Sequence, residues 1–236
     1  VAGDLTFTGL VTVASGGTWN ETAATIITFS SGLTNSGTFT SSTGNHIFDG
    51  TAKTITGTIS IPTVTISGTT SNAGTLTVAT ALSGASTLTN SATGTLNIGG
   101  TSGITGLTAT ATGNVVTYNK SGAQTVKAVS YDTLNLSGSG VKTIGSGITI
   151  ADSLTIASGV SAALTGDTTA NDLTIDSTLK YTGSWGSTSS SATYQNDTYF
   201  SGTGMVTAAT GDTPPSSGSS SGTSSHGHVP NIKPQT

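Results

Sequence analysis

The fold is decided by a stretch that occurs twice in the chain. Residues 44–68 read GNHIFDGTAKTITGTISIPTVTISG, and residues 113–138 read GNVVTYNKSGAQTVKAVSYDTLNLSG. Phe48 in the first copy corresponds to Tyr118 in the second, 70 positions later. Both copies alternate apolar with small polar residues, and this period of two predicts strands that each bury one side. A repeat of this length is typical of solenoids and of arrays of similar units.

The same alternation continues outside the two copies. Short segments such as Leu76-Thr-Val and Leu173-Thr-Ile are separated by Gly, Ser and Asn, which favour turns. Thr, Ser and Gly together fill 120 of the 236 positions, and Thr favours strands because it is branched at Cβ. The segments between glycines lack the Glu, Lys, Arg and Gln that build exposed helical faces. We therefore expect an all-β protein.

Two architectures fit this pattern. The first is a parallel β-solenoid, in which the sequence repeat would make three coils of about 23 residues each. The second is an array of antiparallel β-sandwiches, each with a thin core because only 5% of the residues are aromatic. We favour the solenoid and expect a body over residues 1–212, with repeat units near 44–112 and 113–183. Residues 213–236 are rich in Ser, Gly and Pro and form a separate C-terminal arm in this division.

The charge pattern excludes several classes of function. The net charge is −4, there is no Arg, and the six Lys residues are scattered, so clustered contacts to nucleic acid are not expected. Without Cys, disulfides and thiolate metal sites are impossible. No run approaches the roughly 20 apolar residues needed for a membrane span. Nothing in the sequence calls for a cofactor.

Acidic residues gather once, where Asp167, Asp172 and Asp176 fall within ten positions. Catalysis on a glycosidic bond would need two facing carboxyl groups, and no Arg or aromatic sugar platform accompanies these residues. Asp is also common in turns, so we interpret all three as turn residues, with a weak Ca²⁺ site as the alternative. We predict that the protein is not an enzyme.

A resemblance adds to this interpretation. The segments beginning at Thr117 and Tyr131, YNKSGAQTV and YDTLNLSG within them, resemble the repeats of large exported bacterial β-strand-repeat surface proteins, which are adhesin-like or similar to autotransporter passengers. The resemblance covers roughly residues 44–166. It implies export, a secreted or cell-surface location, and a structural or adhesive role. The first residue is Val1 rather than Met, as expected of a mature exported chain.

Our leading hypothesis is therefore an extracellular structural protein, a subunit or segment of a filament, sheath or adhesive stalk. Its partners would be copies of itself, joined head to tail by strand addition at the ends of the body. Apolar residues near both chain ends are the candidates for this assembly: Leu5, Phe7, Leu10, Val11, Val13, Val229 and Ile232.

The alternative hypothesis is an adhesin module that binds a surface glycan. Aromatic side chains would be its anchors, because they supply large rigid contact areas. The sequence offers few of them outside the repeats, and the candidates are Trp19, Trp185, Tyr194 and Tyr199.

Overall fold

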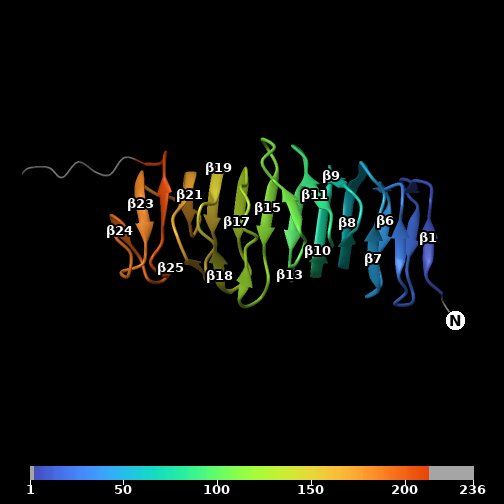
Figure 1. The fold of residues 1–236 in the computed structure, drawn as a ribbon, viewed down its shortest axis with the longest axis horizontal. Coiled ribbons are helices and arrows are strands. Elements are labelled where there is room, and N and C mark those ends of the chain that lie inside the picture. Colours follow the sequence, from blue (N-terminus) through green and yellow to red (C-terminus); the bar gives the residue numbers. More distant parts are fainter. Residues whose placement is uncertain (1–2, 213–236) are drawn as a thin grey trace, which may run out of the picture.

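The computed structural model describes residues 3–212, which form one rod built of strands (Figure 1). The chain winds through about nine coils, and nearly all neighbouring strands are parallel. This parallel stacking is a β-solenoid, so the fold predicted from the sequence is confirmed and the antiparallel sandwich array is excluded. Residues 3–212 contain no helix, and hence none that could cross a membrane.

Each coil contributes a strand to three faces of the rod, which we call faces I, II and III. Face I consists of β1 (Leu5–Phe7), β4 (Ile27–Phe29), β7 (Asn45–Phe48), the ends of β8 (Lys53–Ile66) and β10 (Thr75–Ser83), β13 (Thr101–Ser102), β16 (Gln124–Thr125), β18 (Gly140–Ile144), β20 (Val160–Leu164) and β25 (Phe200–Ser201). Face II consists of β2 (Val11–Val13), β5 (Leu33–Asn35), the start of β8, β9 (Thr70–Asn72), β11 (Thr87–Asn90), β14 (Gly106–Thr108), the starts of β19 (Thr149–Ile156) and β21 (Thr168–Ile175), and β26 (Met205–Ala208).

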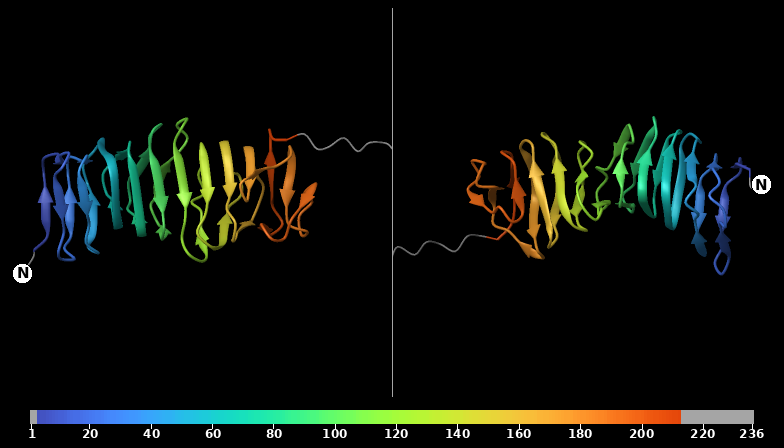
Figure 2. Two further views of the ribbon diagram at one scale, coloured as in Figure 1. Left: turned by 180° about the vertical axis from the view of Figure 1, so that it is seen from behind. Right: turned by 90° about the horizontal axis from the view of Figure 1, so that it is seen from below.

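Face III consists of β3 (Thr18–Asn20), β6 (Thr38–Thr40), the middle of β8, the start of β10, β12 (Thr95–Ile98), β15 (Val115–Tyr118), β17 (Thr133–Leu136) and the ends of β19 and β21. Three short strands complete the C-terminal end: β22 (Thr178–Leu179), β23 (Gly183–Gly186) and β24 (Tyr194–Gln195). The long strands β8, β10, β19 and β21 run around a corner from one face to the next, because their two ends pair with different strands. The coils follow one another in chain order along the rod (Figures 1 and 2).

The coils are shorter than the 23 residues expected, and their length varies. Leu5 pairs with Ile27, 22 positions later, whereas Thr58 pairs with Thr75, only 17 positions later. The sequence repeat therefore does not correspond to a whole number of coils. Phe48 lies on β7 in face I, but its counterpart Tyr118 lies on β15 in face III. The reason is that every face needs the same alternation, so similar segments can serve different faces.

The core is a set of apolar ladders that run along the rod. On face III the inward residues of successive strands lie in register, namely Ile59, Leu76, Leu96, Val116, Leu134, Leu154 and Leu173. All of these side chains are fully buried. Burying each aliphatic side chain contributes about 1.5–3 kcal/mol, and the narrow interior accommodates a continuous stack of them. The outward positions of the same strands are mostly Thr, Ser and Asn.

Buried asparagines fix the turn between faces II and III. The Asn72 side-chain amide donates to Oδ1 of Asn90 at 2.8 Å, and the Asn90 amide donates to Oδ1 of Asn114 at 3.3 Å. Each of the three residues belongs to a different coil and is fully buried. Their amides also bond to backbone carbonyls, for example from Asn72 to Thr95. The ladder thus satisfies backbone groups that a buried turn would otherwise leave unpaired.

Face I is interrupted between β13 and β16, where the strand ladder is not continuous. Gln124 bridges the interruption, because its buried side-chain amide donates to the carbonyls of Ile98 and Gly100 at 2.7 and 2.8 Å. One coil further on, the buried Lys142 ammonium donates to three backbone carbonyls, those of Lys120, Gly122 and Ser139. Gln124 therefore replaces backbone bonds that are missing at the break, and Lys142 satisfies buried carbonyls in the next coil, where β16 and β18 are paired.

The two ends of the rod differ in how their strand edges are treated. At the C-terminal end, β25 pairs with β20, β26 with the start of β21, and β22 with the end of β21. All three faces of the last coil are thereby covered. At the N-terminal end, β1, β2 and β3 pair only with β4, β5 and β6. Within residues 3–212 nothing pairs with their outer edges.

Candidate functional site

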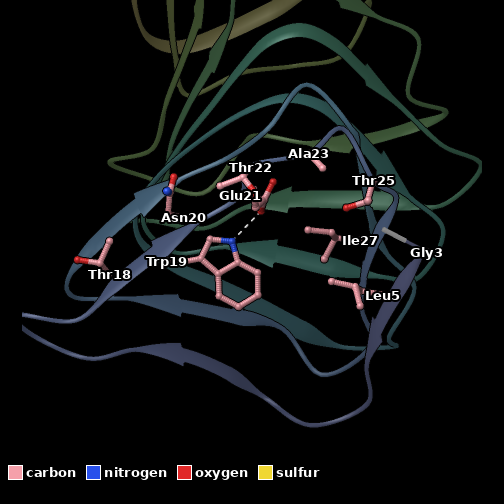
Figure 3. Close-up of a pocket in the computed structure, with 10 residues that line it drawn as sticks. All are labelled: Gly3, Leu5, Thr18, Trp19, Asn20, Glu21, Thr22, Ala23, Thr25 and Ile27. Atoms are coloured by element: carbon pink, nitrogen blue, oxygen red, sulfur yellow. Dashed lines mark hydrogen bonds between the residues drawn. The ribbon is translucent and has the colours of Figure 1, made fainter. Parts of the chain in front are cut away.

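A pocket lies in the first coil, at the open N-terminal end (Figure 3). Its volume is about 580 Å³, and its lining comes from β1, β3, β4 and the turn between β3 and β4. Leu5, Trp19 and Ile27 supply the apolar part, while Glu21 and Thr25 supply polar groups. The pocket exists because no further coil of the described chain fills the interior above the first one.

Aromatic rings stack beneath this pocket. Phe7, Phe29 and Phe48 occupy equivalent positions of β1, β4 and β7, with ring centroids 5.9 and 5.2 Å apart. On face III, Trp19 stacks on Phe39 at 5.9 Å and meets Phe7 edge to face at 5.4 Å. The ladder ends at Phe7 and Trp19, which are only partly buried. One side of each ring therefore has no aromatic partner within the described residues.

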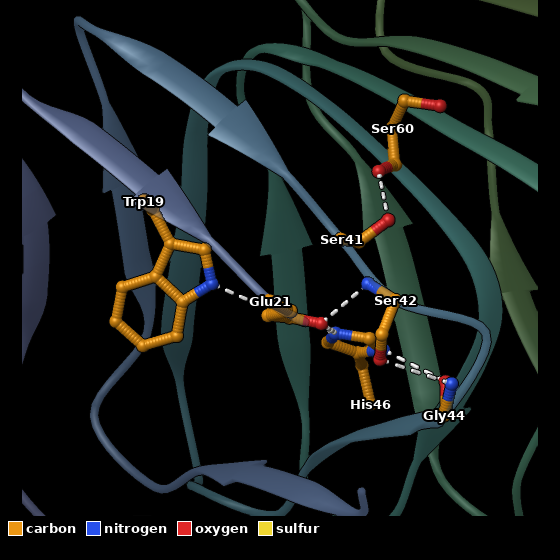
Figure 4. A network of polar contacts seen from close by, with 7 residues as sticks. All are labelled: Trp19, Glu21, Ser41, Ser42, Gly44, His46 and Ser60. Carbon is orange, nitrogen blue, oxygen red and sulfur yellow. Dashed lines mark hydrogen bonds and ion pairs between the residues drawn. The ribbon is translucent and has the colours of Figure 1, made fainter. Parts of the chain in front are cut away.

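A polar network holds Trp19 in place (Figure 4). Glu21 Oε1 accepts a hydrogen bond from the Trp19 indole at 2.7 Å, and Oε2 accepts one from the Ser42 backbone at 2.6 Å. His46 Nε2 lies 2.9 Å from Glu21 Oε2, and its Nδ1 lies 3.0 Å from the Gly44 carbonyl. Both ring nitrogens of His46 thus lie within hydrogen-bonding distance of oxygen atoms.

The Glu21–His46 pair is buried, with side-chain exposures of 6% and 0%. Burial by itself raises the pKa of Glu21, but donors from Ser42, Trp19 and His46 outweigh it and hold the pKa below its ordinary value. These residues come from the turns that follow β3 and β6, in adjacent coils. Since its oxygens are already occupied, Glu21 serves to position Trp19 and has no free site for a ligand.

The other aromatic candidates lie at the C-terminal end. Trp185 on β23 and Tyr194 on β24 are stacked, with ring centroids 4.6 Å apart. Tyr181 packs against Tyr194 at 5.9 Å, and its carbonyl accepts the Trp185 indole hydrogen at 2.9 Å. A small pocket of about 170 Å³ lies beside Tyr181 and Trp185, with Lys180 also in its lining. Tyr181 was not among the sequence candidates.

The structure thus separates the four predicted aromatic residues. It brings Trp185 and Tyr194 together, places Trp19 at the opposite end of the rod, and packs Tyr199 partly buried against the core. The predicted assembly residues of the N-terminal end all lie in the first coil. Leu5 and Leu10 are 49% and 58% exposed, whereas the others are partly or mostly buried: Phe7, Val11 and Val13. Val229 and Ile232, in the arm 213–236, lie outside the described residues.

Sequence reasoning missed the Glu21–His46 pair. Glu21 is the one Glu of the chain, and His46 is the one His outside residues 213–236. They are 25 positions apart, and only the stacking of coils brings them together. Their rarity was the one available signal, because a charged residue in a chain that is 7% charged needs a reason to be there.

The aspartates near the C-terminal end do not converge on one point. Asp167 accepts a hydrogen bond from the Met205 backbone at 3.2 Å, and Asp172 accepts one from the Thr210 hydroxyl. Asp176 sits in a turn with φ of 49°, whereas Asp172 lies within β21, so its prediction as a turn residue is wrong. Across residues 3–212 no three His, Cys, Asp or Glu side chains are grouped so as to hold a metal ion. Asp167 and Asp172 instead tie the last coil to residues 205–210.

A third hollow of about 410 Å³ lies at the interruption of face I. Its lining is polar and includes Ser102, Lys120 and Gln124. Gln124 already spans it with bonds to the neighbouring coil, so the hollow is part of the strand break described above.

The chain matches no protein-family model, no curated protein and no solved structure.

Proposed function

We propose that the chain is an extracellular structural protein without catalytic activity, whose rod-shaped body joins head to tail with further copies through its open N-terminal end. The observation that carries this proposal is the open end itself. Three strand edges have no partner there within the described residues, and the aromatic ladder stops at the partly buried rings of Phe7 and Trp19. Unpaired edges of this kind add strands from another chain.

Exposed apolar residues support the same conclusion. Five large aliphatic side chains of the described residues are exposed, and three of them, Leu5, Leu10 and Ile26, belong to the first coil or the turn after it. A fourth, Leu179, lies on β22 at the C-terminal end. Covering a half-exposed leucine would contribute about 1 kcal/mol. The two ends therefore hold most of the surface that association would bury.

We take the C-terminal end of a second copy as the partner of the open end. That end carries Leu179 and the rings of Tyr181, Trp185 and Tyr194, which match the apolar character of Leu5 and Trp19. Contacts between two different surfaces repeat from copy to copy, so they produce a fibre unless the rotation closes a ring.

Light scattering over a range of concentrations, with electron microscopy of the same samples, tests this proposal. We expect the unaltered chain to form long fibres, and the double variant Leu5→Glu/Leu10→Glu to remain monomeric. Val141→Glu is the matched control, because Val141 is 40% exposed on face I in the middle of the rod. Monomers at every concentration, or equal loss of fibres in the control, would contradict the proposal. Growth that stops at dimers would indicate a contact between two N-terminal ends.

The extracellular location rests on the resemblance of the repeats to exported surface proteins. Immunogold labelling of intact cells that produce the protein tests it, and label confined to the cytoplasm would contradict it.

A second candidate function is glycan binding, favoured by the stacked rings of Trp185 and Tyr194 and the pocket beside Tyr181. Sugar rings pack well on aromatic faces, and Lys180 and Asp212 border the same pocket. Binding on a glycan array that is lost in Trp185→Ala but kept in Trp19→Ala would support this function. Absence of binding to every glycan would remove it.

A further inference from the structure

The proposed head-to-tail joint leaves the N-terminal pocket to be filled, and the chain contains a segment suited to it. We infer that residues 229–233 of one copy occupy the N-terminal pocket of the next copy. This inference rests on the proposed function and specifies the part of the partner that enters the site. Four features support it: the apolar lining of the pocket, the charges of residues 3–52 and 213–236, the length of the unpaired strands, and the distance that residues 213–232 can span.

The lining of the pocket calls for an apolar occupant. Leu5, Trp19 and Ile27 face a volume of about 580 Å³, and Leu5 is 49% exposed. Pockets of this size and character normally bury an apolar group. Within residues 213–236, Val229 and Ile232 are the two large aliphatic residues. Every other residue there is Ser, Thr, Gly, Pro, His, Asn, Gln or Lys.

The charges of the two regions are complementary. Residues 3–52 contain three acidic residues, Asp4, Glu21 and Asp49, and no Lys or Arg. Residues 213–236 contain Lys233 and no acidic residue. Asp4 is an exposed carboxylate between the lining residues Gly3 and Leu5, whereas Glu21 is already bonded to Trp19, Ser42 and His46. Ile232 entering the pocket would bring Lys233 near this negative region, and such complementarity favours the correct partner.

The number of backbone donors in residues 229–233 also matches the length of the unpaired strands. Each of the strands β1, β2 and β3 is three residues long and has an unpaired outer edge within the described chain. Pro230 and Pro234 cannot donate backbone hydrogen bonds, and between them lie three residues that can: Asn231, Ile232 and Lys233. A three-residue donor segment is therefore available for a three-residue edge, and the prolines would limit pairing to that length.

Residues 213–232 are long enough to reach the N-terminal pocket of the next copy. From Thr213 to Ile232 there are about 20 residues, which span up to about 66 Å when extended. Nine coils extend about 43 Å along the rod. Asp212 lies at the C-terminal end, so the pocket of the next copy in a head-to-tail fibre is well within this reach. The pocket of the same copy is also within reach, so the test must separate the two.

Engineered disulfides provide that test, because the chain has no Cys of its own. We expect Leu5→Cys/Ile232→Cys, oxidised during assembly, to give a ladder of covalent multimers on a non-reducing gel. Each single variant should give no product larger than a dimer. Val141→Cys/Ile232→Cys is the matched control, since it places a similarly exposed side chain away from the pocket, and it should give at least tenfold less ladder.

Each outcome distinguishes the inference from the proposed function. Fibres without the Leu5–Ile232 ladder would overturn the inference and leave head-to-tail assembly standing. A fast-migrating covalent monomer as the main product would also overturn it, because the segment would then fill its own pocket. If the unaltered chain forms no fibres, head-to-tail assembly is contradicted, and the inference that rests on it is contradicted as well.

A second measurement avoids new cysteines. In a Trp185→Phe background, Trp19 is the one remaining tryptophan and lines the pocket. We expect its emission to shift to shorter wavelength on assembly, and Ile232→Asp to abolish the shift and reduce fibre mass at least tenfold. Ser220→Asp adds the same charge to the arm outside residues 229–233 and should change neither. Equal effects of the two variants would overturn the inference.

Discussion

The two ends of the rod differ in how their outermost strands are paired. Most internal strands pair with the coil before and the coil after, apart from the breaks between β13 and β16 on face I and between β6 and β8 on face III, whereas the first coil has a free edge on all three faces. At the C-terminal end residues 178–208 fold back onto all three edges, partly with antiparallel strands, and the outer edges of β22 and β25 are themselves unpaired within residues 3–212. At the N-terminal end the edges of the first coil have no cover within residues 3–212. Antiparallel strands therefore interrupt the parallel stacking at the C-terminal end, whereas at the N-terminal end the stacking stops at the first coil of the described residues without such strands.

The ends also differ in what stabilises them. The first three coils contain an aromatic ladder and the Glu21–His46 pair, whereas the C-terminal end relies on Trp185, Tyr194 and local turns. The chain has two tryptophans, Trp19 near one end and Trp185 near the other. In a Trp185→Phe background, fluorescence therefore reports on the N-terminal end alone, and in a Trp19→Phe background it reports on the C-terminal end alone.

The largest expected effect is the loss of the aromatic ladder. Phe29 is fully buried and stacks between Phe7 and Phe48, so Phe29→Ala should cost about 3–5 kcal/mol of unfolding free energy. Urea titrations should show the Trp19 signal lost well before the Trp185 signal, since each coil contacts only its neighbours. A single transition shared by both tryptophans would show that the ends are one cooperative unit.

Glu21→Gln should have the next largest effect. It replaces the carboxylate that accepts hydrogen bonds from Trp19 and Ser42 and pairs with His46, which should cost about 1.5–3 kcal/mol, again at the Trp19 end. Asp197→Asn is the comparison at the other end. Asp197 accepts bonds from the Thr188 backbone and hydroxyl but is fully exposed, so its replacement should shift the Trp185 transition much less. Similar shifts for both variants would contradict this account of Glu21.

Acid should weaken the N-terminal end in the same sense. The folded-state pKa of Glu21 lies below its ordinary value of about 4.5, so as the pH falls the unfolded chain binds this proton first. The stability contributed by the Glu21 interactions is therefore complete above that value and is lost as the pH falls through the folded-state pKa. In urea titrations at a series of pH values, the Trp19 midpoint should fall in this range, and Glu21→Gln should flatten the fall. An undiminished fall in that variant would assign it to other carboxylates.

The smallest expected effect concerns the turn that ends the solenoid. Asp176 and Ser177 connect β21 to the antiparallel β22, and both have positive φ, 49° and 62°. Two such residues favour Asp-Gly, so Ser177→Gly should stabilise the C-terminal end by about 0.5 kcal/mol. The Trp185 transition should rise slightly while the Trp19 transition stays unchanged. A decrease would mean that the Ser177 side chain matters more than its backbone.

Much of the fold could be predicted from local sequence. Alternation such as Leu173-Thr-Ile has one physical solution, a strand with one buried side, and a sparse aromatic content favours a narrow continuous core over separate sandwiches. The length of the coils could not be predicted in the same way. Segments equivalent in sequence, around Phe48 and Tyr118, lie on different faces because the turns between strands vary in length.

The candidate site also combines residues that the sequence indicated with contacts that only the structure revealed. Sequence alone indicated Leu5 and Leu10, because they belong to a strand-like segment near the N-terminus, and the two tryptophans, because aromatic residues are few. It could not show that Trp185 meets Tyr194 or that Glu21 meets His46. Those contacts join coils or fold-back strands, and such pairings depend on register.

The sequence by itself determined that the chain forms strands with apolar inner faces, because the period of two is a local property of neighbouring residues. The tertiary structure alone decided the number of coils, the pairing of distant polar residues and the difference between the ends. Each of these depends on which coil lies next to which, and hydrogen bonds between coils fix that order over separations of 17 to 22 residues, and of 38 residues where β25 and β26 pair with β20 and β21. An edge is open or covered only relative to its neighbours, so no single segment can reveal it.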